Sequence, residues 1–292
     1  MPELTLEKPA AEVEERKRPE TVRLQATRGF GRVLAPRELW RYRDLAFQIA
    51  VRDLTIRYRQ TAFGAAWAIL QPVAFMVVFS LIFGNFAGIK PPAGIPYGLF
   101  SLAALVPWLF FANAFLLGSE SLVLNQALVA KIYFPRIFIP AGIVAAGCVD
   151  FCVSLTILIV IVLVYGIVPS ATIVVLPLLM AIAVATALGA STALSAVNVR
   201  YRDVRYVIPF ATQMWLFLTP IVYPSSSLGE PLRTLSAINP MVGVVEGFRW
   251  AIFNAGSAPL DLMAISAVSA AVLLVAGLSY FDRVERSFAD LI

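Results

Sequence analysis

Long uncharged runs dominate the chain, and the charges between them divide it into a series of apolar segments. Lys90 and Glu120, for example, enclose 29 residues that carry no charge. A helix needs about 20 apolar residues to cross the hydrocarbon core of a bilayer, where every backbone amide must be hydrogen-bonded internally. The pattern therefore predicts an all-α integral membrane protein with six transmembrane helices. Their expected ranges are about 67–87, 98–118, 140–166, 171–197, 206–223 and 262–281.

The distribution of basic residues predicts how these segments are oriented. Of the 23 Lys and Arg residues, 20 lie before the first segment, between the second and third, between the fourth and fifth, or after the sixth. Only Lys90, Arg233 and Arg249 fall in the loops of the opposite face. Because cytoplasmic loops are enriched in Lys and Arg, both termini are expected in the cytoplasm.

Two segments precede the first span. Residues 1–36 mix acidic and basic side chains and lack the apolar core of a signal peptide, which predicts a mobile cytoplasmic tail. Residues 37–62 combine arginines with a broad apolar face, as in an amphipathic helix that lies in the membrane surface against anionic headgroups. A solvated helix before the first span is the alternative. The basic residues assigned to this interface helix are Arg41, Arg52, Arg57 and Arg59.

Composition supports a membrane protein over a nucleic-acid-binding one. Hydrophobic residues make up 60% of the chain and charged residues 14%, whereas soluble domains average about half and a quarter. The net charge of +5 arises beside apolar spans, so lipid headgroups are the expected anionic partner and no nucleic acid is expected.

The residues for catalysis or energy coupling are missing from the sequence. The four lysines, Lys8, Lys17, Lys90 and Lys131, do not follow a glycine, as the lysine of a phosphate-binding loop must. There is no histidine and no apparent pair of catalytic carboxylates, so we expect neither a metal site nor a catalytic residue. Asp150 is expected to be hydrogen-bonded between helices or near the interface, since one carboxylate makes a poor ion pathway. The chain is expected to be a conduit driven by another polypeptide.

Several stretches, in unbroken order over about 37–290, are similar to those of a known family. They are "RDLTIRYRQTAFGAAWAILQP" (52–72), "LVAKIYFPRIFIP" (128–140), "NVRYRDV" (198–204), "FLTPIVYP" (217–224), "INPM" (238–241) and "FRWAIF" (248–253). Together they resemble the permease subunits of ABC-2 type exporters, specifically those for O-antigen, capsule and teichoic acid polysaccharides. Residues 37–292 would then form the transmembrane domain.

The resemblance implies a homodimer with a channel between two six-helix subunits in the cytoplasmic (inner) membrane. Two copies of a separate nucleotide-binding ATPase subunit would bind ATP and magnesium, so this chain would need no cofactor. The expected substrate is a lipid-linked polysaccharide, O-antigen-like or teichoic-acid-like. The alternative is an ABC-2 permease for a small hydrophobic drug or lipid. A membrane-embedded transferase is a further alternative. It would require acid/base groups near the bilayer, and the chain has no histidine and no apparent pair of catalytic carboxylates.

The resemblance also places an ATPase-coupling segment at 119–136. Its polar positions are Glu120, Asn125, Gln126, Lys131 and Arg136. A polar cluster on an otherwise apolar loop suits a protein partner, although a helix that lies on lipid is the alternative. The outer segment 225–260 is too long for a turn and is expected to form short re-entrant helices, whose irregular backbone needs protein or water around it.

Aromatic residues indicate a candidate channel face. In the first span they are spaced by four, four and three residues, which places them on one side of an α-helix. Aromatic rings stack on the C–H faces of sugars, whereas lipid contact or helix packing is the alternative explanation. The candidates are Phe75, Phe79, Phe83 and Phe86 in the first span, and Phe210, Trp215, Phe217 and Tyr223 in the fifth.

Overall fold

The described part of the computed structural model is entirely helical in its regular elements. It comprises residues 43–59, 66–92, 94–131, 134–201 and 203–285, and no strand occurs within them. These residues all belong to one unit of the chain, Gly31–Ile292. The expected tail at 1–36 and the interface residue Arg41 lie outside the described residues.

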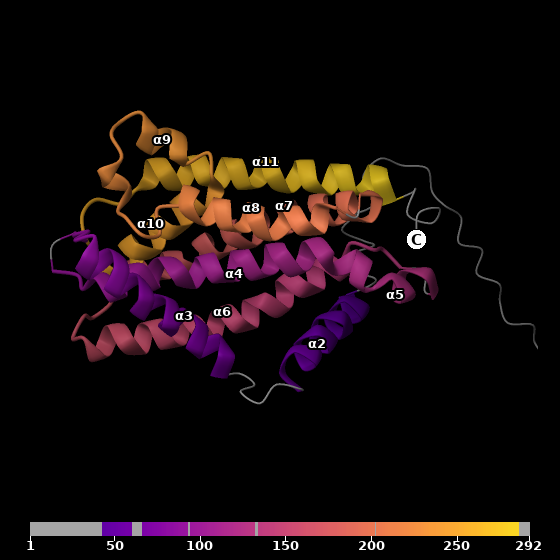
Figure 1. The fold of residues 1–292 in the computed structure, drawn as a ribbon, viewed down its shortest axis with the longest axis horizontal. Helices are drawn as coiled ribbons and strands as arrows, with labels where there is room; N and C mark the ends of the chain where they lie inside the picture. The colour runs from indigo at the N-terminus through magenta and orange to yellow at the C-terminus, as the bar shows by residue number, and fades with distance from the viewer. Residues whose placement is uncertain (1–42, 60–65, 93, 132–133, 202, 286–292) are drawn as a thin grey trace, which may run out of the picture. The chain divides into compact units, whose positions relative to one another are not determined.

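Long apolar helices are joined by loops and by short helical elements (Figure 1). In chain order they are α2 (Arg43–Arg59), α3 (Ala66–Phe79), η2 (Ser80–Phe86), α4 (Tyr97–Leu124), α5 (Gln126–Lys131), α6 (Phe138–Val164), η3 (Ala171–Val175), α7 (Leu176–Arg200), α8 (Val204–Leu218), η4 (Ser225–Ser227), α9 (Leu232–Ser236), α10 (Pro240–Phe253) and α11 (Leu260–Glu285). Among the short elements, η2 is a π-helix and η3 and η4 are 3₁₀-helices.

Within the part of the chain that the structure describes, five helical segments are long and apolar enough to cross a membrane. They are Ile69–Phe86, Tyr97–Leu124, Phe138–Val164, Ala171–Arg200 and Leu260–Glu285. Each coincides with one of the apolar runs expected from the sequence, which makes the chain an integral membrane protein.

The expected fifth span, 206–223, is not one continuous helix. Its helix, α8, has 15 residues and ends at Leu218. A proline disfavours helical backbone in the residue before it, and Thr219 before Pro220 is extended, with φ −103° and ψ 133°. The helical range predicted for this span was therefore too long at its C-terminal end.

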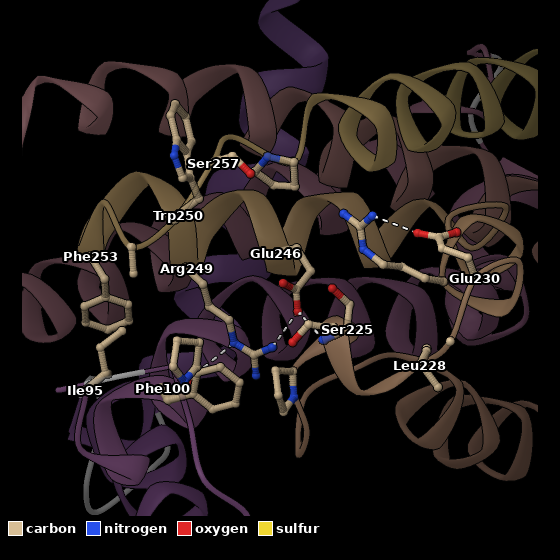
Figure 2. Close-up of a pocket in the computed structure, with 18 residues that line it drawn as sticks. Ile95, Phe100, Ser225, Leu228, Glu230, Glu246, Arg249, Trp250, Phe253 and Ser257 are labelled. Atoms are coloured by element: carbon tan, nitrogen blue, oxygen red, sulfur yellow. Dashed lines mark hydrogen bonds and ion pairs between the residues drawn. The ribbon is translucent and has the colours of Figure 1, made fainter.

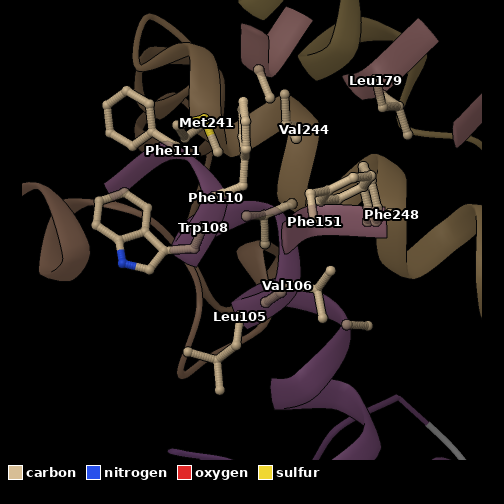
Figure 3. Close-up of a cluster of buried hydrophobic side chains, with 14 of the residues drawn as sticks. Leu105, Val106, Trp108, Phe110, Phe111, Phe151, Leu179, Met241, Val244 and Phe248 are labelled. Atoms are coloured by element: carbon tan, nitrogen blue, oxygen red, sulfur yellow. The ribbon is translucent and has the colours of Figure 1, made fainter. Parts of the chain in front are cut away.

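Helix α4 is the centre of the bundle. It packs against α3, α6, α7, α8 and α10, and 18 of its 28 residues are buried, which explains why it is apolar on every side. Figure 3 shows Phe110 of α4 close to Phe151 of α6 and Phe248 of α10. The ring centroids of Phe110 and Phe151, and of Phe151 and Phe248, are 5.9 Å apart in edge-to-face pairs.

Small residues let the long helices approach closely, as is common between helices in membranes. A Cβ atom added to Gly277 of α11 would overlap the carbonyl oxygen of Gly189 of α7. The two helices therefore meet backbone to backbone at this point.

Helix α2 is attached to the bundle by a smaller apolar cluster. Ile49 is buried there with Leu122, Phe138 and Phe281, and its Cγ2 atom lies where a side chain at Gly142 of α6 would have to be. The predicted interface helix is thus held against α6 by specific packing.

Candidate functional site

The aromatic stripe predicted in the first span is only partly formed. The rings of Phe75 and Phe79 are 5.8 Å apart, and those of Phe79 and Phe83 are 5.5 Å apart, each pair edge to face. These three rings form a ladder along one side of the helix. Phe79 is buried, so the ladder belongs partly to the core, and it is exposed mainly at Phe75. The structure brings together three of the four predicted residues.

Phe86 lies away from that ladder because the helix changes type before it. The amide of Ala87 donates to the carbonyl oxygen of Ile82, five residues back, as in a π-helix, which has more residues per turn than an α-helix. The three-residue step from Phe83 therefore does not keep Phe86 on the same side, and its side chain is 88% exposed.

The aromatic residues of α8 point in two directions. Phe210 and Phe217, seven residues apart on one side of the helix, are 62% and 57% exposed. Trp215 instead packs against Phe111 and Phe115 of α4, with ring centroids 4.8 Å and 5.5 Å away. Its indole N–H donates to Oδ1 of Asn239 over 2.8 Å, so its placement is that of a packing residue.

Beyond α8, side chains hold a non-helical segment of turns and bends, Thr219–Tyr223, which contains the predicted residue Tyr223. Arg249 of α10 donates from Nη1 to the carbonyl oxygen of Pro220 and from Nη2 to that of Ile221, each over 2.6 Å. The hydroxyl of Tyr97 donates to the carbonyl oxygen of Val222 over 2.8 Å. Because buried carbonyl groups need a donor and the helix has ended, these side chains replace the missing backbone amides.

The arginine that holds this segment is itself deeply buried. Arg249 is 5% exposed, its Nε donates to the carbonyl oxygen of Phe100 over 3.2 Å, and its guanidinium lies 3.5 Å from the centroid of the Phe100 ring. Burial lowers the pKa of Arg249 below its usual value, and the carboxylate of Glu246, 2.9 Å from Nη1, opposes that shift. The guanidinium stays charged because its pKa begins so high.

Sequence reasoning counted Arg249 only as one of the few basic residues on the outer face. The signal that could have found its role is the Glu246–Arg249 pair, spaced by three residues in a helix that is otherwise apolar. Such spacing places two side chains together. The carbonyl groups that they reach lie too far away along the chain to be read from the sequence.

A cavity of about 670 Å³ opens beside Arg249, within the predicted outer loops. Figure 2 shows Ile95 and Phe253 at one end of its lining and Leu228 and Glu230 at the other. Parts of the chain before α4, after α8 and between α10 and α11 all contribute to its wall.

A cluster of polar residues connects α9 to α11 beside this cavity. Nη1 of Arg233 lies 3.0 Å from Oε1 of Glu230 and 3.2 Å from Oδ2 of Asp261. The hydroxyl of Thr234 donates to Oε2 of Glu230 over 2.8 Å. That hydrogen bond, followed by the one from Arg233, lowers the pKa of the Glu230 carboxyl.

Hydrogen bonds tie the predicted coupling segment to other parts of the chain, including α2 and α11. Asn125, at the end of α4, accepts a hydrogen bond from Nη2 of Arg52 over 3.0 Å, so this predicted interface residue contacts the bundle. Nη1 of Arg136 donates to the carbonyl oxygen of Glu285 over 3.1 Å.

The remaining polar residues of the segment differ in exposure. Gln126 is exposed and Glu120 is partly exposed. The side chains of Lys131, Arg57 and Arg59 lie outside the described residues. The structure therefore places Asn125 and Arg136 in contacts within the chain and leaves Gln126 accessible.

Comparison with known proteins covers most of the helical bundle. The sequence pattern of the family described as "ABC-2 type transporter" matches residues 45–253. An "O-antigen export system permease protein RfbA" of Myxococcus xanthus is 32% identical over 261 residues, which are 88% of this chain and 98% of that protein. Two proteins of the same name from Klebsiella pneumoniae are 27% and 26% identical over 250 residues, 85% of this chain and 95% of each.

The family match covers most of the chain and includes α3–α10, which contain the central helix, the non-helical segment Thr219–Tyr223 and the buried arginine. The chain belongs to the ABC-2 type transporter family of membrane proteins.

Proposed function

We propose that the chain is the permease subunit of an ATP-driven exporter that moves a lipid-linked polysaccharide, O-antigen-like or teichoic-acid-like, across the cytoplasmic membrane. The observation that carries this proposal is the similarity to O-antigen export permeases over 85–88% of the chain. In this proposal the chain catalyses no reaction, and ATP is hydrolysed in two copies of a partner subunit that also holds magnesium.

The proposed topology has six membrane passages, with α8 and the non-helical segment Thr219–Tyr223 forming the fifth. Fifteen helical residues span about 22 Å, less than the roughly 30 Å of the hydrocarbon core. The non-helical residues 219–223 would complete the passage. Irregular backbone at membrane depth must be satisfied by protein groups, and the contacts from Arg249 and Tyr97 meet that requirement.

The excess of basic residues in alternate loops supports cytoplasmic termini. With that orientation α2 lies on the cytoplasmic side, and its exposed Arg43 would face anionic lipids. The outer segment 225–260 contains α9 and α10, and 11 of the 14 residues of α10 are buried. A buried short helix of this kind supports a re-entrant element covered by protein.

The polysaccharide would pass between two copies of this chain. The exposed side chains of α3 and α8 are largely apolar, and they include Phe75, Phe210 and Phe217. In a homodimer these faces would line a passage whose rings contact sugars without tight polar binding. The ladder partners Phe79 and Phe83 would support Phe75 from behind.

The segment 119–136 would contact the ATPase. Its ties to α2 through Arg52 and to α11 through Glu285 support this role, because a push on the segment would reach two other helices. Gln126, which is exposed, would lie at the contact.

Deletion of the gene from the host bacterium tests the function. We expect loss of the surface polysaccharide, accumulation of its lipid-linked form inside the cell, and recovery when the intact chain is supplied. Normal surface polysaccharide in the deletion strain would overturn the proposal. Increased drug sensitivity with normal surface polysaccharide would instead favour a permease for small hydrophobic compounds.

A further inference from the structure

The outer cavity is lined by charged, hydroxyl and aromatic side chains in addition to apolar ones. Four of its residues come from one side of α10, at spacings of three, one and three: Glu246, Arg249, Trp250 and Phe253. Its volume of about 670 Å³ falls within the range of about 300–1,000 Å³ typical of ligand sites. The cavity is therefore large enough for a ligand rather than for a single water molecule.

The charges in this lining are already paired with one another. Arg249 contacts Glu246 at 2.9 Å, and Arg233 contacts Glu230 at 3.0 Å. Asp261 adds a further negative charge beside Arg233. An anionic group such as a phosphate would have to compete with these carboxylates for each arginine, so the lining favours an uncharged ligand.

The remaining groups suit a ligand with many hydroxyls. Trp250 and Phe253 provide partly exposed aromatic rings, and Ser226 and Ser257 provide exposed hydroxyl groups. Glu246 uses Oε1 for its contacts with both Arg249 and the amide of Ser225. Its Oε2 has no donor among the described residues and can accept a hydrogen bond from the ligand. Rings for C–H faces beside acceptors for hydroxyls are the features by which proteins bind sugars.

We propose that this cavity is a binding subsite for a short, uncharged saccharide segment on the outer face of the permease. The subsite rests on the proposed function, since the exported chain would supply the saccharide. It lies apart from the rings of α3 and α8 assigned to the passage, because none of Phe75, Phe210 and Phe217 lines it. A saccharide held there would be one that has already emerged.

Protection of a cysteine inside the cavity tests the subsite directly. Ser257→Cys would be made in full-length chain that carries Cys148→Ala and Cys152→Ala, purified in lipid nanodiscs and labelled with a maleimide. The probe is a neutral oligosaccharide released from the host's own surface polysaccharide. At ten times its dissociation constant we expect labelling to slow about tenfold, because occupied cavities are shielded.

Three controls make the result specific. Leu235→Cys is exposed on α9 and does not line the cavity, so its labelling should not change. Trp250→Ala should abolish protection of Ser257→Cys, whereas Trp250→Phe, which keeps a ring and the fold, should retain part of it. Inorganic pyrophosphate should give no protection.

The outcomes separate this inference from the proposed function. Absence of protection, protection that survives Trp250→Ala, or protection by pyrophosphate alone would each overturn the subsite. Export is judged independently by the deletion strain, so a permease that exports polysaccharide without saccharide protection at Ser257→Cys would refute only the subsite.

Discussion

Arg249 of α10 donates from Nη2 to the carbonyl oxygen of Ile221 over 2.6 Å, although the two residues lie 28 positions apart. This contact fastens the non-helical end of the proposed fifth passage to a buried short helix. It also makes Arg249 the residue whose loss should disturb the largest number of buried polar groups.

Arg249→Met should destabilise the protein by about 3–5 kcal/mol, because it leaves Glu246 as a largely buried charge without its partner and several carbonyls without donors. Thermal unfolding of the detergent-purified chain measures this. Arg233→Met, which removes a more exposed ion pair, should cost about 1 kcal/mol or less. The double variant Arg249→Met/Glu246→Met should recover part of the loss, and a double variant worse than the sum of both single changes would contradict the argument.

Gly277→Ala should destabilise the contact between α7 and α11 by roughly 1–3 kcal/mol, since the new methyl group would overlap the backbone of Gly189. Gly229→Ala is the matched control, because nothing lies within 4 Å of a Cβ atom there and surface changes usually stay within about 0.5 kcal/mol. Equal melting temperatures of the two variants would show that the helices separate easily at this point.

The two orientations of the aromatic residues in α8 predict opposite phenotypes. Trp215→Ala should lower stability by about 3 kcal/mol, because it removes packing against Phe111 and Phe115 together with the bond to Asn239. Phe210→Ala and Phe217→Ala should leave the melting temperature nearly unchanged and reduce the amount of surface polysaccharide per cell. Full export by the double variant Phe210→Ala/Phe217→Ala would remove these rings from the passage.

Gln126→Arg and Lys131→Glu should weaken co-purification with the ATPase without altering the stability of the permease, since Gln126 is exposed at the coupling segment. Leu235→Arg on α9, at the other end of the bundle (Figure 1), serves as the control. Unchanged co-purification and unchanged stimulation of ATP hydrolysis would show that the ATPase contacts another surface.

The polar cluster at α9 should respond to pH in a defined direction. The folded-state pKa of Glu230 is lowered, so its contribution is present above the unfolded pKa and is lost as the pH falls through the folded value. Thr234→Val removes the largest cause and should raise the pKa of Glu230 toward its ordinary value of 4.5. Carbon-13 NMR of labelled glutamate side chains, assigned with Glu230→Gln, measures the titration, and an unchanged midpoint would contradict the assigned cause.

The apolar spans could be predicted because they depend on length alone. An uncharged run such as 91–119 is long enough to cross the hydrocarbon core as a helix. The end of α8 could also have been read from Thr219–Pro220, because the effect of proline on its predecessor is local. The expected range extended past it because apolar residues continue to Tyr223.

The candidate site was harder to predict because its geometry is tertiary. The stripe of phenylalanines assumed 3.6 residues per turn, and the π-helix η2 invalidates that period beyond Phe83. Trp215 could not be distinguished from Phe217 by residue type, since the packing of α4 decides which side of α8 is covered. Arg249 was missed for the same reason, because its acceptors lie in a loop and in α4.

The segment Thr219–Tyr223 has a mechanical property that a continuous helix at this place would lack. Its carbonyl groups are bound by side chains of α4 and α10. A displacement of α10 would therefore move this segment while α8 stayed in place. In the proposed homodimer, the outer mouth of each subunit would then change width without any helix having to unwind.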